Sequence, residues 1–420
     1  MRSVCGPGKL IIHIFHHMAF RKTILALTAV ALISPTALQG RDLADKGDDI
    51  QDINPITTGV ASLRISPDAR GASMGELGAA TDPDANAQYW NSSKYAFAYS
   101  QGAISINYVP WLRKIVNDIY LASVSGYWKI GSQDLQAVSA SLRYFSLGEV
   151  TVGNNQATIS PYEMSFDLGY SRKLSNKYSM GIVFRYIYSA MGYDNTGQEA
   201  NSIGASAFAA DINGYFTYYP IIGRNECQWS WGWNISNIGT KLKYEGQQAA
   251  FLPANLRIGT AFTFPLADYH NLTFGLDLNK LLVPAKPRAQ DFVNEDGSTN
   301  EEAYREAEQE WEDMSSFKGI FKSFGKGYSG KNEFFKEITL SLGAEYAYND
   351  QFFFRAGYFY EHPTKGNRQY FNVGAGFAIS AFKLDACYTV ATAANSPLDQ
   401  TLRFSLTFDV DGLKGLLGKR

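Results

Sequence analysis

Few residues of this sequence have the types and spacing needed for acid-base or nucleophilic chemistry. Two pairs of adjacent carboxylates, Glu301-Glu302 and Glu312-Asp313, are the most suggestive. Paired carboxylates act as general acid and base only where a cleft shifts the pKa of one of them. Because both pairs lie in a charged stretch with helical spacing, we interpret them as a solvated helix face.

Histidine and cysteine are scarce. After residue 40 the chain contains only His270 and His362, and only Cys227 and Cys387. A zinc site needs three or four such ligands close together, so we expect no catalytic residues, no metal and no cofactor. A serine hydrolase that uses one of the two histidines remains an alternative.

The charge balance argues against one class of partner. Lysine and arginine number 38 against 40 aspartates and glutamates, which gives a net charge of -2. Proteins that bind nucleic acid present a basic face, so we expect no nucleic-acid partner.

The N-terminal region has the pattern of an export signal. Met18 begins a short basic segment, and the apolar run 23–34 follows it with small residues behind. We predict that residues 1–40 form the signal region, that Met18 is the natural start, and that cleavage falls between Ala37 and Gly40.

The rest of the chain alternates between apolar residues and small or polar ones. In segment 178–190, one row of residues is apolar or aromatic, whereas the other row contains Gly181 and Arg185. A strand with one lipid face and one lumen face produces this pattern, which is the signature of a transmembrane β-barrel. Fourteen such runs occur, at 101–109, 119–130, 135–147, 163–174, 178–190, 203–219, 226–237, 253–264, 271–281, 334–348, 352–361, 369–380, 382–393 and 400–410.

The number of runs and their connections predict a closed antiparallel barrel. Fourteen is an even number, as in bacterial outer-membrane barrels. Connections such as 175–177 and 349–351 are short, whereas most connections at the other end are long. Because periplasmic turns are short and outer loops long, we expect the first strand to run outward and both termini to be periplasmic. A soluble β-sandwich also alternates, but the row Trp229, Trp231 and Trp233 suits lipid better than water.

The predicted lumen carries charges of both signs and has room for a plug. Residues 52–98 precede the first strand and are polar and rich in glycine. We expect them to fold inside the barrel, because buried charges need partners of opposite sign. A loosely held periplasmic tail is the alternative. The plug charges are Arg64, Asp68, Arg70, Glu76, Asp82 and Asp84, and the inward wall charges include Arg143, Arg185, Arg257, Arg355, Lys383, Arg403, Asp167, Asp277, Glu345, Glu361, Asp385 and Asp409.

Segment 81–97 is the most distinctive part of the plug. Asp82-Pro83-Asp84 is turn chemistry, and Tyr89-Trp90 are large side chains that normally need burial with a satisfied polar tip. We therefore assign the anchoring of the plug to Arg70, Asp82, Asp84, Tyr89, Trp90 and Asn91.

These residues carry a resemblance to known proteins. The stretch ARGASMGELGAATDPDANAQYWNSSKYAF, residues 69–97, resembles the N-terminal hatch of the FadL-type family of outer-membrane barrels. The longer stretch 53–91 is similar to the PorV family of the type IX secretion system, a member of the same superfamily. One departure is visible, because the chain has Ser92 where relatives commonly have proline after the asparagine, which puts the rigidity of the plug exit in doubt.

The resemblance implies a function that is not enzymatic. Barrels of the PorV family associate with the translocon barrel of type IX secretion and bind cargo by its C-terminal signal domain. They then carry the cargo to a surface attachment complex that contains the sortase. A protein in the outer membrane also contacts the lipid bilayer and lipopolysaccharide. The alternatives are a FadL-like channel for hydrophobic solutes and an outer-membrane enzyme that modifies lipid A.

One long outer insertion could bind a partner. Thr299 and Glu302 fit a capping box, and the following residues place one apolar stripe at helical spacing. The insertion either packs on itself as a lid or offers a surface to a partner. The candidate contact residues are Tyr304, Trp311, Phe317 and Phe321.

The predicted organisation is therefore simple. Residues 41–98 form a periplasmic N-terminus and lumenal plug, and residues 99–410 form the barrel. The barrel includes the outer insertion 282–333, and residues 411–420 form a periplasmic C-terminal tail.

Overall fold

The protein is described here by a computed structural model. The described residues are 53–113, 116, 118–131, 134–152, 157–194, 201–294, 296–328, 333–393 and 396–418. The predicted export signal, its start and its cleavage site lie outside these residues.

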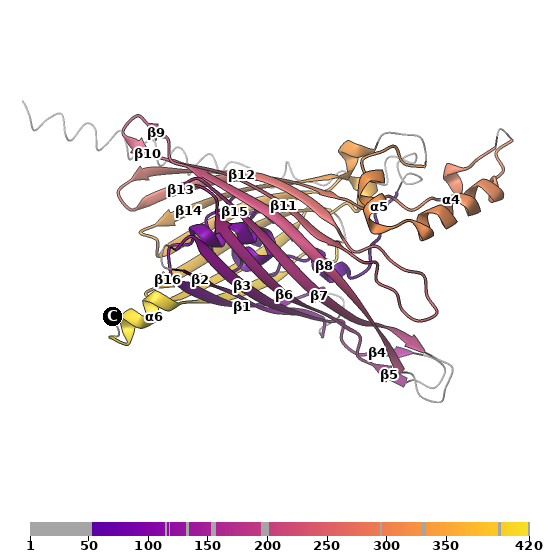
Figure 1. Ribbon diagram of the computed structural model, residues 1–420, viewed down its shortest axis with the longest axis horizontal. Helices are drawn as coiled ribbons and strands as arrows, with labels where there is room; N and C mark the ends of the chain where they lie inside the picture. The colour runs from indigo at the N-terminus through magenta and orange to yellow at the C-terminus, as the bar shows by residue number, and fades with distance from the viewer. Residues whose placement is uncertain are drawn as a thin grey trace, which may run out of the picture. The chain divides into compact units, whose positions relative to one another are not determined.

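Fourteen antiparallel strands form a closed barrel, as predicted (Figure 1). Each strand pairs with its neighbour in the chain, and the last strand pairs with the first, so no strand of the barrel has an open edge. The strands are β1 (Gly102–Pro110), β2 (Tyr120–Ile130), β3 (Gln136–Ser146), β6 (Tyr162–Lys173), β7 (Tyr178–Asp194), β8 (Asn201–Tyr218), β11 (Gln228–Gly239), β12 (Asn255–Ala267), β13 (His270–Leu281), β14 (Ile338–Tyr348), β15 (Phe352–Tyr360), β16 (Gln369–Ile379), β17 (Phe382–Ala391) and β18 (Leu402–Asp409).

The alternation along each strand decides which side chains face outward. In β7, Phe184 is 63% exposed whereas the next residue, Arg185, is buried. An apolar outer surface suits lipid, and the closed ladder pairs the backbone amides that lipid could not satisfy. The predicted facing of β7 is confirmed by its burial pattern.

The connections differ in length at the two ends of the barrel. β6 and β7 are joined by residues 174–177, and β14 and β15 by residues 349–351. The opposite end carries the insertion between β13 and β14 and the hairpin β4 (Val150–Val152) and β5 (Ala157–Ile159). We call these the short-turn end and the long-loop end. The hairpin β9 (Ile221–Ile222) and β10 (Asn225–Glu226) lies at the short-turn end (Figure 1).

A chain of tyrosines runs around part of the long-loop end. Ring centroids of successive pairs are 5.8, 6.2, 5.4 and 5.9 Å apart. Aromatic rings of this kind mark the membrane–water interface, because they have an apolar body and a polar tip. The chain comprises Tyr108, Tyr120, Tyr144, Tyr162 and Tyr188 on five neighbouring strands.

Short helices occur in the connections between strands and after the last strand. Among the described residues, no helix has both the length and the apolar character to cross a membrane. In α4 the side chain of Asn300 accepts from Ala303 N, so the helix begins one residue later than the predicted capping box requires. The elements are η6 (Ala289–Asp291), α4 (Glu301–Asp313), α5 (Ser316–Lys322), η7 (Phe334–Glu337), η8 (Pro363–Lys365) and α6 (Val410–Leu416).

The segment before β1 fills the lumen, which confirms the predicted plug (Figure 1). It contains η4 (Ala61–Arg64), α2 (Ala69–Ser73), α3 (Ala87–Trp90) and η5 (Ser92–Phe97). The helix α2 packs against β15 to β18, whereas η5 packs against β6 to β8 on the other side. The plug therefore bridges opposite walls of the barrel.

Candidate functional site

The first described residues lie at the long-loop end. Asn54 N donates to Thr364 O and Gly59 N donates to Phe251 O, each over 2.8 Å. Ile56 packs into an apolar cluster with Phe251 and the insertion residue Trp311. We expected both termini at the short-turn end. α6 lies there, because Asp411 accepts from Gln101 N just before β1, but the N-terminus itself lies outside the described residues.

Trp90 is the centre of the plug. Its indole N–H donates to Asp68 Oδ1 over 2.6 Å, and Asp68 Oδ2 accepts from Gly71 N at the start of α2. A Cβ atom on Gly71 or Gly78 would lie 2.4 Å from the indole ring. Both glycines are therefore required by the close approach of the Trp90 ring, and Trp90 is 2% exposed.

Arg70 connects the plug to the wall. Its Nε and Nη2 donate to the two oxygens of Glu345 over 3.1 and 3.0 Å. Its Nη1 donates to the carboxylate of Asp84 over 2.8 Å and to Asp82 O over 3.1 Å. The guanidinium thus ties the predicted turn to strand β14.

The other predicted plug residues also lie in the lumen. Asp82 accepts from Gln228 of β11 over 2.7 Å. The amide of Asn91 donates to Ala79 O and to Gly214 O of β8, each over 2.9 Å. Its Oδ1 accepts from Ser93 N and so caps η5. The exit of the plug is therefore fixed by Asn91 although Ser92 replaces the proline of relatives.

Only part of the predicted charge pairing between plug and wall is present. Arg64 pairs with Glu361 and Glu76 with Arg403, each over 3.4 Å, in addition to the pair formed by Arg70. The three plug aspartates use neutral donors or Arg70 instead. Asp68 and Asp84 accept from backbone amides close in the sequence, which is the usual behaviour of aspartate at turns and helix starts.

The wall touches the plug closely through a glycine and through an aspartate side chain. A Cβ atom on Gly357 of β15 would lie 2.1 Å from backbone atoms of Met74 and Gly75. Asp277 of β13 accepts from Gly78 N and Ala79 N over 2.8 and 2.9 Å. Glycines on the inward face of a strand often mark the close approach of another backbone. In the sequence, these glycines and the glycine-rich plug were the features that could have predicted this contact.

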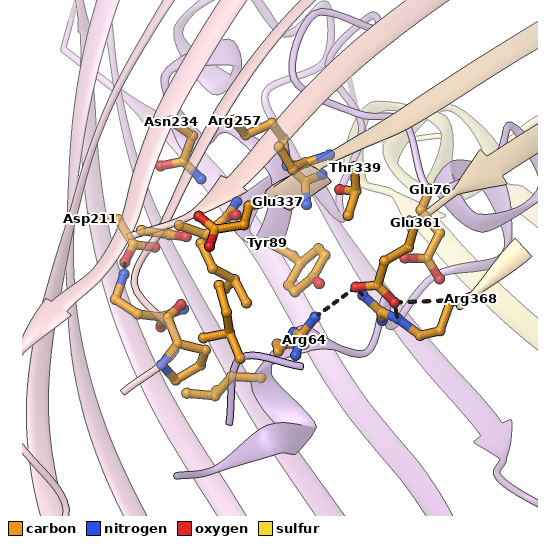
Figure 2. Close-up of a pocket in the computed structure, with 18 of the residues that line it drawn as sticks. Arg64, Glu76, Tyr89, Asp211, Asn234, Arg257, Glu337, Thr339, Glu361 and Arg368 are labelled. Carbon is orange, nitrogen blue, oxygen red and sulfur yellow. Dashed lines mark hydrogen bonds and ion pairs between the residues drawn. The ribbon is translucent and has the colours of Figure 1, made fainter. Parts of the chain in front are cut away.

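A polar cavity of about 90 Å³ lies between the plug and the long-loop half of the wall (Figure 2). Six cationic and four acidic side chains line it, and three of the cations share Glu361 and Glu337 as partners. Tyr89 projects among these charged groups (Figure 2). The guanidiniums of Arg143 and Arg257 lie 4.9 and 5.7 Å from the centre of the Tyr89 ring.

The outer insertion packs on itself and on the loop before β12. Trp311 is buried against Phe251 and donates from its indole to Pro284 O over 3.1 Å, and Tyr304 contacts Phe292. These two predicted contact residues therefore stabilise the insertion. Phe317 and Phe321 are 67% and 75% exposed.

Ion pairs join the two helices of the insertion. Lys318 and Lys322 of α5 lie 3.3 and 3.2 Å from Glu310 of α4. Hydrogen bonds from Lys322 and Lys318 lower the pKa of Glu310. The first carboxylate pair, Glu301-Glu302, is exposed on the first turn of α4, which fits a solvated helix face.

The two histidines lie at opposite ends of the barrel. His270 begins β13 at the short-turn end and bonds to the Tyr346 hydroxyl over 2.6 Å, whereas His362 lies in the loop after β15 and bonds to Thr364. Within the described part of the chain, no three His, Cys, Asp or Glu residues are grouped as a metal site requires.

Comparison with known proteins gives one family. The profile of the family described as "Type IX secretion system protein PorV" matches residues 48–288, which is more than half of the chain. No curated protein sequence matches. Similar solved structures include the Pseudomonas putida toluene transporter TodX, with 10% identity, a TM-score of 0.44, and coverage of 81% of this chain and 96% of TodX. They also include a Pseudomonas aeruginosa FadL homologue, with 12% identity, a TM-score of 0.40, and coverage of 85% and 99%.

Proposed function

The chain belongs to the PorV family of type IX secretion system proteins, and from this membership we propose that it is a cargo carrier of that system. It binds the C-terminal signal domain of a secreted protein at the translocon barrel in the outer membrane. It then delivers the cargo to the surface attachment complex that contains the sortase.

The plugged lumen is the observation that supports a carrier most directly. The plug touches opposite walls and is held by buried ion pairs and hydrogen bonds, such as Arg70 with Glu345. A carrier that docks partners on its loops has no need of an open channel. Such a carrier binds its partners through surfaces at the long-loop end.

The FadL-like channel remains a second candidate with less support. A hydrophobic solute needs a mostly apolar pocket with a few polar groups. The cavity beside the plug is lined instead by charged side chains, including Arg185, Asp211 and Arg368. A lipid A enzyme has less support again, because His270 and His362 are at opposite ends of the barrel.

The contact surface that we propose is on α5. Phe317 and Phe321 present aromatic side chains to solvent beside Lys318 and Lys322. Aromatic side chains are enriched at the centres of protein interfaces. The packed residues Tyr304 and Trp311 hold this surface in place through α4.

The test is a pull-down of the tagged protein from detergent-solubilised outer membranes, with mass spectrometry of the proteins that copurify. We expect the translocon barrel, cargo with an intact C-terminal signal domain, and components of the attachment complex. The double substitution F317S and F321S should reduce recovery of at least one of these partners about tenfold or more, as loss of an interface anchor does.

A matched control removes an exposed aromatic residue elsewhere. Tyr99 is 79% exposed just before β1, at the short-turn end, so Y99S should leave every partner in place. Recovery of no secretion component with the wild-type protein would refute the carrier function. Normal recovery with the double variant would refute only the assignment of α5.

A further inference from the structure

Two arginines beside Tyr89 have donor nitrogens without a hydrogen-bond partner among the described residues. Arg143 of β3 is 6% exposed, and its Nη2 donates to Ser62 O and Ile65 O, each over 2.8 Å. Its Nη1 is buried and has no hydrogen-bond partner among the described residues. A buried charged donor without a hydrogen-bond partner is destabilising, so this position favours the binding of an acceptor.

Arg257 of β12 is in a similar position. Its Nη1 lies 4.0 Å from Asp277 Oδ2, beyond hydrogen-bond distance, and it too has no hydrogen-bond partner in the described part of the chain. The plug already occupies Asp277 Oδ2 with two backbone amides. The Arg257 guanidinium instead lies 4.5 Å from the centre of the Trp90 ring.

The other cations of the cavity have carboxylate partners. Arg185 pairs with Asp211 over 3.0 Å, and Arg64 and Arg368 share Glu361. Lys365 pairs with Glu333 and with Glu337. The excess of positive charge around the cavity is therefore concentrated on Arg143 and Arg257.

An acceptor faces the same space. Asn234 of β11 donates from Nδ2 to Trp90 O over 3.1 Å, which fixes the orientation of its amide. Its Oδ1 is buried, lines the cavity, and lacks a donor among the described residues. Asn279 of β13 also lines the cavity, and its buried Oδ1 lacks a donor among the described residues too. The cavity thus offers two charged donors and two neutral acceptors.

We propose that this cavity is a binding site for a carboxylate, held between the guanidiniums of Arg143 and Arg257 beside Tyr89. Arginine forks match the planar carboxylate group in two-pronged hydrogen bonds. A cavity of about 90 Å³ holds several water molecules or one small group, since one water needs roughly 10–15 Å³. The charged lining does not suit an acyl chain. Its carboxylate comes from a small acid or from the end of a peptide that enters through the long-loop end.

The two sources can be distinguished with defined probes. Succinate represents a small acid, and the acetylated tripeptide Gly-Ala-Gly with a free carboxyl end represents a peptide. The same tripeptide with an amidated end and inorganic phosphate are the comparison probes. Binding is measured by calorimetry and by melting of the purified full chain in detergent at constant ionic strength.

We expect succinate or the acidic tripeptide to bind and to raise the melting temperature, whereas the amidated tripeptide and phosphate bind more weakly. R143Q and R257Q should each weaken binding about tenfold or more, as loss of a charge-assisted hydrogen bond does. K129Q is the matched control, because Lys129 is a lumen cation at the short-turn end whose partner is Asp134. It should leave binding unchanged.

The proposal is refuted if neither carboxylate binds to the wild-type protein, or if the amidated peptide or phosphate binds as tightly. Equal binding by R143Q and R257Q would also refute it. Should these variants not fold, the wild-type probe series still decides. R143K then provides a second test, since it keeps the charge but loses the planar fork and should bind the carboxylate more weakly.

Discussion

The indole nitrogen of Trp90 lies 2.6 Å from Asp68 Oδ1, so that the ring of α3 is fixed to the residue that caps α2. The two residues are 22 positions apart and both are buried. The contact closes the plug on itself. The barrel does not depend on it, because its strands form a separate closed ladder.

Replacing Trp90 by alanine should therefore loosen the plug without unfolding the barrel. Loss of a buried aromatic side chain costs about 3–5 kcal/mol, and Asp68 also loses a donor. We expect trypsin to cleave at Arg70 and ions to leak through the protein in planar bilayers. Tyr89→Ala should act in the same direction but more weakly, because Tyr89 is only half-buried and its hydroxyl faces the cavity.

Trp128→Ala is the control, because Trp128 is 46% exposed on the outside of β2. It should change neither trypsin cleavage nor leakage. A variant that carries both Tyr89→Ala and Trp90→Ala provides the decisive test. If it stays sealed and resistant to trypsin, these residues do not anchor the plug.

The bond between Arg70 and Glu345 leads to a second prediction. Arg70→Ala leaves the buried carboxylate of Glu345 and the partly buried carboxylate of Asp84 with fewer donors, and breaking a buried pair costs about 3–5 kcal/mol. The lower end is expected, because Arg355 also pairs with Glu345 over 2.5 Å. Hydrogen exchange of residues 69–97 should rise, measured by mass spectrometry.

Arg70→Lys separates geometry from charge. Lysine keeps the charge but cannot donate to both oxygens of Glu345 at once. Its effect on exchange should lie between wild type and Arg70→Ala. If hydrogen exchange in Arg70→Lys equals that of the wild type, the two-pronged geometry contributes little.

The barrel could be predicted from the sequence because the alternation of apolar and polar residues is visible within each strand. Each strand alternates with period two, and Phe184 and Arg185 reveal their facing without knowledge of any neighbour. Strand ends were less predictable. Residues 334–337 were included in the tenth predicted run but form η7, and Val410 begins α6 where Asp409 caps it.

The sequence showed which residues form the plug, but it did not show the course of the chain through the lumen. The residue types of Tyr89 and Trp90 predicted burial. No local sequence feature showed that Asn54 and Gly59 form hydrogen bonds to long loops of the barrel. Trp311 illustrates the same limit. Its helical stripe is visible in the sequence, whereas its contact with Phe251, 60 residues earlier, depends on where the barrel places two loops.

The orientation of the barrel in the membrane gives a third prediction. Ser298 in the insertion and Asn176 in a short turn are both exposed, at opposite ends. With an impermeant maleimide on intact cells, Ser298→Cys should be labelled and Asn176→Cys should not. The native Cys227 and Cys387 are buried and should give little background. The reverse pattern would overturn the assignment of long loops to the cell surface.

The facing of β7 gives the last prediction. Phe184 is 63% exposed on the outside of the wall, so Phe184→Arg places a charge in lipid and should cost about 2–4 kcal/mol near the middle of the bilayer. Ser179 of the same strand is fully buried, and its hydroxyl donates to Ser93 O over 2.7 Å. An arginine there has no room beside η5, so the plug must shift while the lipid surface stays intact. Phe184→Arg should therefore lower the urea midpoint for folding into liposomes, whereas Ser179→Arg should chiefly cause leakage and trypsin cleavage at Arg70. Equal folding midpoints and equal leakage for the two variants would show that the two rows of β7 do not separate lipid from lumen.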